Sequence, residues 1–429
     1  MNFVKGFKPS YYDNFYCIGK NCKYTCCKRW SISVKEYEME KWKNTAPDVF
    51  KLYDENTSTT KINDKNMLNI DLNEEGVCPF LDEEGLCSLQ KKYGPEALSA
   101  VCMNFPRKIV DHGDMVEMHL SPGCEKVVQQ FIKEKQGIKL INYKIKNATY
   151  TRLAKDKKRE EERAIFNYYY DIKVLLLSIL QNRDYTIEER MLILGIAMKK
   201  LDEMEKQNRI NEIPIFVDVF LESIEEQDIT KKLRDFTCNE TIQMLHNFVN
   251  MQMTMLKKEF NSFDEFIEKI KDRITPNYDD ELVLSETKKM TYMSLATSRK
   301  YEFDEKDYSL RKYKEAIQEY KEFIKDKEYY IENYLVTWIL YKDIPFSNDT
   351  ADIWDEYCYF AIMYSMYRFI LTCCLNKNSH DDEFIDCTVR FSRGIIHTHD
   401  DHLKELILSL KEKEKNNLDY IAIMLLQEN

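Results

Sequence analysis

Two residue types are scarce in this sequence, and each absence narrows the possible sites. No histidine precedes His112, and after Gly137 the only glycines are Gly195 and Gly394. The turn G-x-G-x-x-G, which binds a dinucleotide between a strand and a helix, occurs nowhere. The sequence therefore argues against a doubly wound α/β domain for a nucleotide-like cofactor.

Net positive charge and long apolar runs are also missing. The 74 acidic and 63 basic side chains give a formal net charge of −11, which argues against a nucleic-acid partner. The segment from Tyr357 to Leu375 is mostly apolar, but Arg368 and four tyrosines interrupt it, so we interpret it as a buried helix rather than a membrane span. The start of the chain, Met1 to Pro9, has no apolar run that resembles a signal peptide. We expect a cytoplasmic protein.

Cysteine, in contrast, is abundant and unevenly placed. Eight of the thirteen cysteines fall within the first 124 residues: Cys17, Cys22, Cys26, Cys27, Cys78, Cys87, Cys102 and Cys124. Short gaps between thiols let a loop direct several sulfurs to one point, so the spacing predicts a metal site. Because no histidine is nearby, sulfur would supply almost all ligands, and both zinc in a four-thiolate cage and an iron–sulfur cluster stay open.

The cysteines allow other interpretations as well. A disulfide framework requires an oxidising compartment and is typical of short chains, and neither condition fits this sequence. The side chains of the neighbours Cys26 and Cys27 diverge, so one can bind a metal while the other packs. The later cysteines show no ligand spacing, and we interpret them as buried packing groups. These are Cys238, Cys358, Cys373, Cys374 and Cys387.

Glycine and proline divide the chain into two parts. We expect a small cysteine-rich metal-binding module at residues 1–137 and a large all-helical bundle or stack at residues 138–429, a mainly α protein. In the second part, Ile187, Met191, Leu194 and Met198 recur at helical spacing after the capping-box sequence that begins at Thr186. The further helices that we expect run approximately over residues 158–181, 240–259, 279–297, 308–325, 328–342, 349–376 and 399–413.

The first part has weaker signals. Short helices are expected at about 35–44, 94–102 and 126–135. Residues 54–71, with the polar run Asn56 to Thr60, show little periodicity and are expected to form an exposed loop between the two groups of cysteines. A bound metal would tie these groups together, so its binding would also stabilise the module.

At these cysteines the chain resembles the flagellin lysine-N-methylase (FliB) family. The resemblance covers about the first 125 residues, with weaker landmarks at 332–334, 345–346 and 390–397. A broader group of short zinc- or iron-chelating proteins shares only part of the pattern. The matching residues are Tyr11, Phe15, Cys17, Gly19, Cys22, Cys26, Cys27, Trp30, Cys78, Pro79, Phe80, Leu81, Gly85, Leu86, Cys87, Gln90, Tyr93, Gly94, Leu98, Ser99, Cys102, Pro106, Arg107, Cys124 and Glu125.

The resemblance implies a protein-lysine N-methyltransferase that serves the bacterial flagellum. It implies S-adenosylmethionine as methyl donor, flagellin lysines as acceptors, and a cysteine-bound iron–sulfur centre, for which we expect the 4Fe-4S type with zinc as the alternative. A second hypothesis is a non-catalytic metal-binding scaffold or chaperone for an unpolymerised filament protein. The two differ in whether purified protein adds methyl groups to flagellin.

The residues leave the catalytic site unassigned. A lysine amine has a pKa of about 10.4 and must lose its proton before it can accept a methyl group, yet no general base can be named from the sequence. The methyl donor has three candidate positions: the metal centre, the space between the two parts, and the helical part near 332–334 or 390–397. Arg107 is the one cation that we single out, either as a partner for the donor's carboxylate or in an ordinary ion pair.

Overall fold

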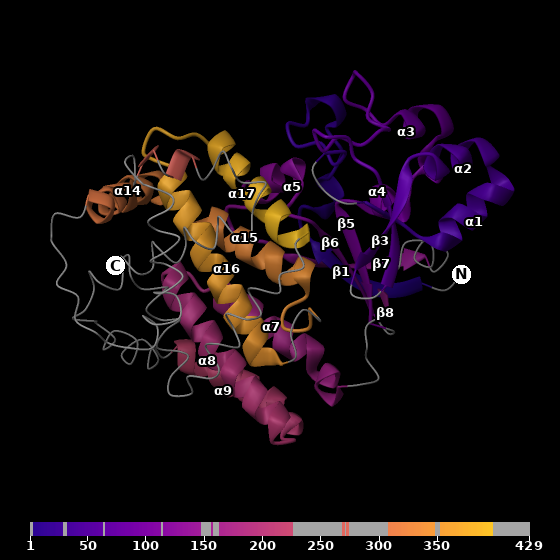
Figure 1. The fold of residues 1–429 in the computed structure, drawn as a ribbon. Helices are drawn as coiled ribbons and strands as arrows, with labels where there is room; N and C mark the ends of the chain where they lie inside the picture. The colour runs from indigo at the N-terminus through magenta and orange to yellow at the C-terminus, as the bar shows by residue number, and fades with distance from the viewer. Residues whose placement is uncertain are drawn as a thin grey trace. The chain divides into compact units, whose positions relative to one another are not determined.

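The computed structural model describes residues 3–28, 32–62, 65–112, 115–146, 156–157, 163–225, 268–270, 272–273, 308–347 and 352–397. These residues are mainly helical, as predicted (Figure 1). The chain divides into two compact units. The first unit consists of residues 1–134, 138–158 and 395–397, and the second consists of residues 135–137, 159–394 and 398–429.

The first unit contains a five-stranded sheet, which the sequence did not predict. Its order is β7-β1-β6-β5-β8, formed by β1 (Phe3–Pro9), β5 (Arg107–Asp111), β6 (Met115–Leu120), β7 (Leu140–Lys146) and β8 (Asp156–Lys157). Strand β1 runs parallel to β6 and antiparallel to β7. Because β7 and β8 follow residue 137, the chain beyond that residue is not helical throughout. Adjacent to these strands in sequence are η1 (Tyr12–Asn14), η2 (Gly19–Asn21) and α5 (Glu125–Phe131).

A smaller sheet and several short helices complete the first unit. The sheet has the order β2-β4-β3, formed by β2 (Ser33–Val34), β3 (Thr57–Ile62) and β4 (Lys65–Ile70). The helices are α1 (Glu36–Thr45), α2 (Pro47–Asp54), α3 (Ser88–Tyr93), η3 (Pro95–Ala97) and α4 (Ala100–Asn104). Helices α1 and α5 confirm predicted segments, whereas the single helix expected at 94–102 is split between η3 and α4, with Ser99 as the N-cap of α4.

The prediction of an exposed loop at residues 54–71 is wrong. Strands β3 and β4 pair antiparallel in this segment, with Thr57 opposite Ile70 and Thr59 opposite Leu68. Threonine is β-branched and fits a pleated strand, so the polar run that we interpreted as a loop has high strand propensity. The Asn69 amide also donates to the Thr60 hydroxyl across the hairpin.

The second unit is built from helices in the part of the chain that the structure describes. Its elements are η4 (Ala164–Tyr168), α7 (Tyr169–Leu180), α8 (Ile187–Lys206), η5 (Ile210–Glu212), α9 (Ile213–Glu225), α14 (Tyr308–Ile324), α15 (Glu328–Lys342), α16 (Ile353–Cys374) and α17 (Asp381–His397). The Thr186 hydroxyl and the Glu189 side chain form the predicted capping box of α8. Helices α9 and α17 were not predicted, and the expected helices at 240–259, 279–297 and 399–413 lie outside the described residues.

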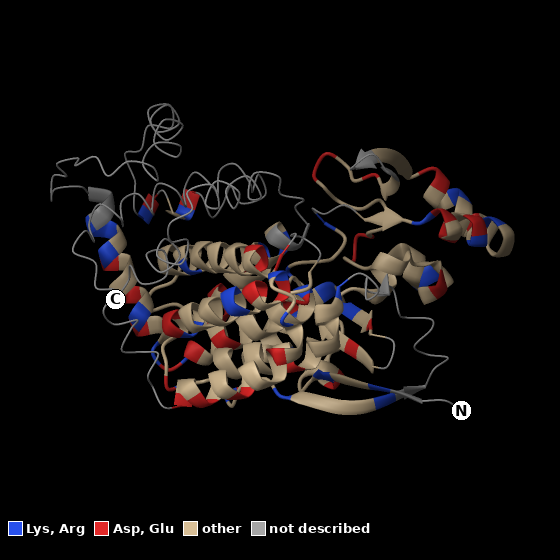
Figure 2. Ribbon diagram, turned by 90° about the horizontal axis from the view of Figure 1, so that it is seen from below, with Lys and Arg blue, Asp and Glu red and all other residues tan. Residues whose placement is uncertain are grey.

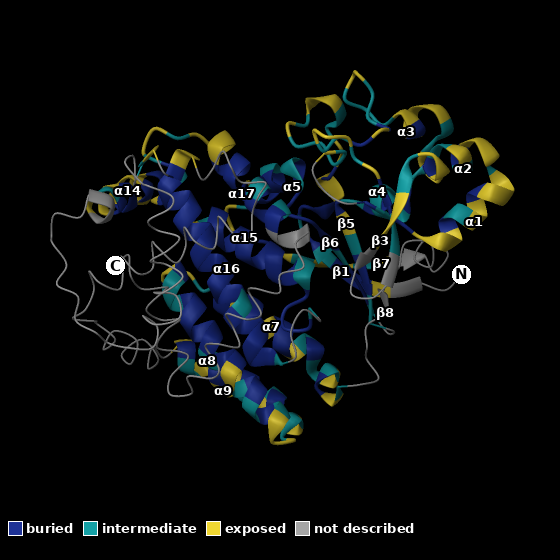
Figure 3. Cartoon of the chain, viewed as in Figure 1, coloured by how far each residue is buried: buried dark blue, intermediate teal, exposed yellow. Residues whose placement is uncertain are grey.

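Helix α16 lies at the centre of the second unit. Almost every residue of α16 is buried, including Arg368, as the dark blue ribbon in Figure 3 shows. This confirms that the apolar segment from Tyr357 to Leu375 is a buried helix. Among the described helices, none is both long and apolar enough to cross a membrane. Acidic and basic residues are interspersed along the helices (Figure 2).

Close contact between α8 and α16 depends on Gly195. A Cβ atom at this position would overlap the Tyr357 ring, whose hydroxyl donates to the Met191 carbonyl at 2.9 Å. Gly195→Ala would normally stabilise a helix, but here we expect overpacking to lower the free energy of unfolding by about 1–3 kcal/mol. Urea denaturation measures the change. Lys200→Ala on the same helix is the control, and equal stability of the two variants would contradict the close contact.

Candidate functional site

Four of the predicted metal ligands gather in the first unit. Cys26 lies between η2 and β2 in the sequence, Cys78 begins the Cys-Pro-Phe-Leu turn, Cys87 is the N-cap of α3, and Cys102 lies within α4. Electrostatic interactions link each of the other three thiols to Cys102. A backbone hydrogen bond of 2.9 Å from Cys78 N to Cys27 O joins the first two segments. The structure therefore brings together residues that are far apart in the sequence.

We call this group the thiol cluster (Cys26, Cys78, Cys87 and Cys102). Cys78 belongs to a hydrophobic core, and Cys87 and Cys102 pack against that core. The stacked rings of Trp42 and Tyr53, with centroids 4.3 Å apart, pack in the same hydrophobic core as Cys78. The Tyr53 hydroxyl donates to Ala97 O at 3.1 Å and accepts from Ser99 N at 3.0 Å. These contacts fix the start of α4, and with it Cys102.

Burial makes thiolate charge costly in the thiol cluster. It raises the pKa of Cys78 to about 11, with further upward contributions from Cys87 and Cys26. Burial likewise raises the pKa of Cys102 to about 12, partly offset by Ser99 and increased by the other three thiols. Both thiols are therefore protonated at neutral pH when no cation is present, and a bound metal would have to displace their protons.

The thiol cluster is not arranged as a binding site for a single metal ion. Among the described residues, no three Cys, His, Asp or Glu side chains form a group that could hold one metal ion. The twelve cysteines in the described part of the chain form no disulfide with one another. Four thiolates around one zinc ion lie within about 3.8 Å of each other, given Zn–S distances of about 2.3 Å. The residue types of the thiol cluster suit a metal centre, but its side chains are not placed as ligands of a single ion.

The remaining predicted ligands lie in other surroundings. Cys27 packs against the core beside the cluster. The Cys22 thiol is 3.6 Å from Glu125 Oε2, an oxygen that also accepts from Lys23 N at 2.8 Å. Cys124 is the N-cap residue of α5, directly before Glu125. Cys17 is exposed and accepts from Gly19 N at 3.4 Å. The eight cysteines thus fall into at least two local environments.

Arg107 is exposed at the start of β5 and is held by aromatic side chains. Its guanidinium carbon lies 4.7 Å from the centroid of the Phe15 ring, and its charge and hydrogen bond lower the pKa of Tyr12. Burial outweighs this effect and raises the pKa of Tyr12 to about 12. Phe15 precedes Cys17 by two residues, and Arg107 follows Cys102 by five. In the described part of the chain, Arg107 forms no ion pair, so its charge is not neutralised by an acidic side chain.

In the second unit, residues 332–334 were the first candidate segment for the methyl donor, and Glu332 in this segment forms ion pairs within the unit. The buried Glu332 carboxylate accepts from the Arg183 guanidinium in two hydrogen bonds of 2.9 Å and from Arg190 Nη1 at 2.9 Å. Tyr334 packs on Tyr367 with ring centroids 4.2 Å apart. These contacts engage the Glu332 carboxylate and the Tyr334 ring within the helical unit, so we assign these two residues a structural role.

The second candidate segment, residues 390–397, also packs internally where side chains are described. The Ser392 hydroxyl donates to the Tyr334 hydroxyl at 3.3 Å, and Arg390 Nε lies 3.3 Å from Asp386 Oδ2. The side chains of residues 395–397 lie outside the described part. The described members of this segment therefore provide helix packing rather than an open site.

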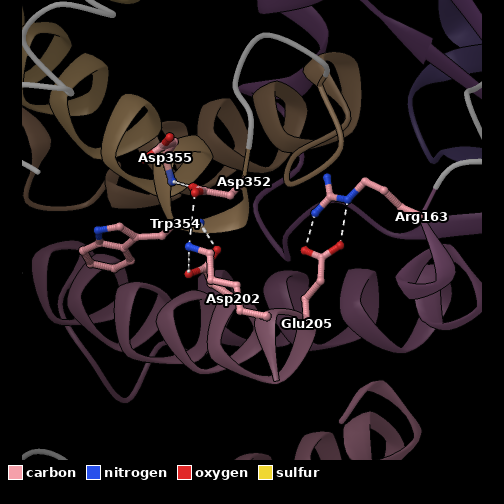
Figure 4. Close-up of polar contacts among 7 residues, drawn as sticks. Arg163, Asp202, Glu205, Asp352, Trp354 and Asp355 are labelled. Carbon is pink, nitrogen blue, oxygen red and sulfur yellow. Dashed lines mark hydrogen bonds and ion pairs between the residues drawn. The ribbon is translucent and has the colours of Figure 1, made fainter. Parts of the chain in front are cut away.

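Acidic residues gather near the start of α16, in a group that the sequence did not suggest (Figure 4). Asp352 caps the helix by accepting from Asp355 N at 3.0 Å, and Lys206 Nζ bridges Asp202 at 2.7 Å and Asp352 at 3.1 Å. Arg163 Nε donates to Glu205 at 2.8 Å in the same view. Caps and ion pairs account for these contacts, so the group joins α8 to α16.

Comparison with known proteins gives two kinds of match. The family model described as FliB lysine N-methylase C-terminal domain matches residues 173–424. A lysine-N-methylase of Salmonella choleraesuis (strain SC-B67) is 30% identical over 147 residues, which are 33% of this chain and 36% of that protein. The flagellar biosynthetic protein FliU of Salmonella muenchen is 30% identical over 135 residues, which are 31% of this chain and 80% of that protein.

A third relative matches the chain over a segment of similar length. A lysine-N-methylase of Salmonella typhimurium (strain LT2) is 28% identical over 145 residues, which are 33% of this chain and 36% of that protein. The matched segment thus spans little more than a third of either lysine-N-methylase. No solved structure matches the chain.

Proposed function

The chain belongs to the FliB lysine N-methylase family, and we propose from this premise that it methylates lysine side chains of flagellin with S-adenosylmethionine as donor. The observation that carries the proposal is the match of the family's C-terminal domain model to residues 173–424, more than half of the chain. The similarity to two proteins named lysine-N-methylase supports the reaction. The similarity to a flagellar biosynthetic protein supports flagellin as substrate and, with it, action in the cytoplasm before export.

The reaction is a displacement at a methyl carbon. S-adenosylmethionine supplies an electrophilic methyl group on a sulfonium sulfur. The neutral lysine nitrogen attacks this carbon, the carbon–sulfur bond breaks with its electron pair moving to sulfur, and the nitrogen releases a proton. Since a lysine amine has a pKa of about 10.4, the protein has to favour the neutral amine by desolvation or with a base.

Arg107 is our candidate for binding the donor's carboxylate. Its exposed guanidinium is positioned by Phe15 and Tyr12 and forms no ion pair within the described residues. An arginine held in place by aromatic groups can bind a carboxylate through two parallel hydrogen bonds. The rest of the donor site is not assigned to residues.

Arg107→Ala tests this assignment. We expect the affinity for S-adenosylmethionine to fall about tenfold or more, because a charge-assisted hydrogen bond contributes about 1.5–3 kcal/mol. Isothermal titration calorimetry measures the affinity. Lys51→Ala, which removes an exposed cation from α2 in the same unit, should bind like the wild type. Equal affinities of the wild type and Arg107→Ala would remove Arg107 from the donor site.

We also propose an iron–sulfur centre at the thiol cluster, with Cys27, Cys22, Cys17 and Cys124 as further candidate ligands. Four thiols from separate segments that interact with one another support it, since cysteines without a shared ligand are otherwise expected to be dispersed. A cluster of several irons holds its thiolates farther apart than a single zinc ion does, which suits a group that forms no single-ion cage. When bound, the centre would link α3 and α4 to the segment that contains Cys26.

The alternative is a scaffold that binds an unpolymerised filament protein without chemistry. Incubation of the purified protein with S-adenosylmethionine and flagellin separates the two functions. Methylation predicts that the intact mass of flagellin rises by multiples of one methyl substitution. The scaffold predicts a complex in size-exclusion chromatography with flagellin of unchanged mass, and that result would overturn the proposed reaction.

A further inference from the structure

The segment that carries the first cysteines has little apolar anchoring of its own. From Tyr16 to Lys28 no residue is buried, and the regular structure of this segment consists of η2. Backbone contacts to residues 77–78 tie down its last two residues. Because burial contributes little here, polar contacts to neighbouring elements have to hold Cys17 and Cys22 in place.

Helix α5 supplies such contacts. Gln130 Nε2 donates to Asn14 O, just ahead of the segment. Lys126 Nζ donates to the Tyr16 hydroxyl at 3.2 Å and lies 4.3 Å from the centroid of the Tyr16 ring. The helix itself is well anchored, because its apolar side chains are completely buried. These side chains are Val127, Val128 and Phe131.

The Glu125 carboxylate contacts the segment at Cys22 itself. Its Oε2 atom accepts from Lys23 N at 2.8 Å and from Tyr24 N at 3.4 Å, and lies 3.6 Å from Cys22 Sγ. Gln129 Nε2 donates to the other oxygen, Oε1, at 3.1 Å and so fixes the orientation of the carboxylate. One oxygen of α5 therefore binds three consecutive residues that lie more than a hundred positions away in the sequence.

These hydrogen bonds fix the backbone beside a candidate metal ligand. A backbone N–H bound to a charged oxygen is held about twice as strongly as one bound to a neutral acceptor. Rotation about its Cα–Cβ bond redirects the Cys22 thiol, whereas the neighbouring amides keep its backbone in place. A metal ligand has to lie within a narrow range of positions, so a residue that fixes this backbone affects metal binding without contacting the metal.

We propose that Glu125 is a positioning residue, which holds the backbone beside Cys22 so that the Cys22 thiolate can bind iron. This role depends on the proposed iron–sulfur centre. What Glu125 supplies is a hydrogen-bond acceptor, and the side-chain amide of glutamine supplies one as well. Glu125→Gln should therefore support the centre, whereas Glu125→Ala should not.

Hydrogen exchange of the full-length protein, purified without oxygen, measures the positioning. In Glu125→Ala we expect the amides of Lys23 and Tyr24 to exchange about tenfold faster or more, because they lose hydrogen bonds to a charged acceptor. Glu125→Gln should exchange like the wild type. Glu40→Ala, which removes an exposed carboxylate from α1 in the same unit, should also exchange like the wild type.

Iron analysis of the same preparations measures the consequence for the centre. Glu125→Ala should contain less iron than the wild type by about twofold or more, whereas Glu125→Gln and Glu40→Ala should contain as much as the wild type. Cys22→Ser should lose iron but keep slow exchange at Lys23 and Tyr24, because Glu125 still binds these amides. The variant with both Cys22→Ser and Glu125→Ala should lose no more iron than Cys22→Ser alone, since Glu125 acts through Cys22.

Three results would overturn the proposal. They are wild-type exchange in Glu125→Ala, wild-type iron content in Glu125→Ala, and loss of iron from Glu125→Gln while its exchange stays slow, which would make Glu125 a ligand. None of these measurements uses flagellin or S-adenosylmethionine. Iron-loaded protein that leaves flagellin unmethylated would contradict the proposed function and not the role of Glu125, whereas iron-free wild-type protein that methylates flagellin would contradict the role of Glu125 alone.

Discussion

Cys102→Ser is expected to remove the metal centre and to reduce methyl transfer to the background rate. Cys102 interacts electrostatically with the other three members of the thiol cluster, and contacts of Ser99 and Tyr53 hold the start of its helix in place. A serine hydroxyl does not replace a thiolate as a ligand of iron, so the remaining thiols would hold the cluster incompletely. Iron and acid-labile sulfide analysis of protein purified without oxygen, together with its visible absorption, measures the loss.

The matched control is Cys358→Ser, a buried cysteine of the second unit with 2% of its surface exposed. This variant should keep the iron content and the brown colour of the wild type. Cys78→Ser should behave like Cys102→Ser. A colourless wild-type protein with stoichiometric zinc would contradict the iron–sulfur centre, and unchanged iron in both cluster variants would contradict the choice of ligands.

Glu332→Gln is expected to destabilise the helical unit by about 3 kcal/mol. Glu332 is 1% exposed and neutralises Arg190, whose side chain is 3% exposed. Removing one partner of a buried ion pair leaves the other charge uncompensated, which costs about 3–5 kcal/mol. Arg190 keeps its hydrogen bonds to Leu180 O and Tyr185 O, so we expect the lower end of this range. Urea denaturation followed by circular dichroism gives the change in free energy.

An exposed ion pair on α14 provides the comparison. Glu315 lies 2.6 Å from Lys312, and Glu315→Gln should unfold like the wild type because exposed ion pairs contribute little. If Glu332→Gln also unfolded like the wild type, the ion pairs would not hold α15 to α8. Residues 332–334 would then return as candidates for substrate binding.

The helices of the second unit were largely predictable because their signals are local. The expected segment 328–342 coincides with α15, and α8 begins at the predicted cap, Thr186. In α15 the long run of helix-compatible residues is bounded by Lys327 and by Asp343, which adopts a left-handed conformation (φ 64°). Such boundaries depend on neighbouring residues alone, so a single sequence can reveal them.

The sheets of the first unit were not predictable in the same way. Strand β1 pairs with β6 and β7, more than a hundred residues away, and no local pattern carries such pairings. The hairpin of β3 and β4 was missed because Thr57, Ser58 and Thr59 were interpreted as polar loop residues, although threonine also favours strands.

The positions of the thiols were also only partly predictable from the sequence. Spacing in the sequence pointed to the N-terminal cysteines, and the structure gathers four of them. The sequence likewise does not reveal that the Glu332 carboxylate forms ion pairs with Arg183 and Arg190, because these residues lie far apart along the chain.

The most direct test of the central claim uses S-adenosylmethionine with a trideuterated methyl group. The protein, this donor and flagellin are incubated, and the flagellin peptides are analysed by mass spectrometry while S-adenosylhomocysteine is quantified. We predict trideuteromethyl groups on lysine side chains in an amount equal to the S-adenosylhomocysteine released, and none with the donor omitted. Flagellin that binds the protein but carries no deuterium would contradict lysine methylation as the function of this chain.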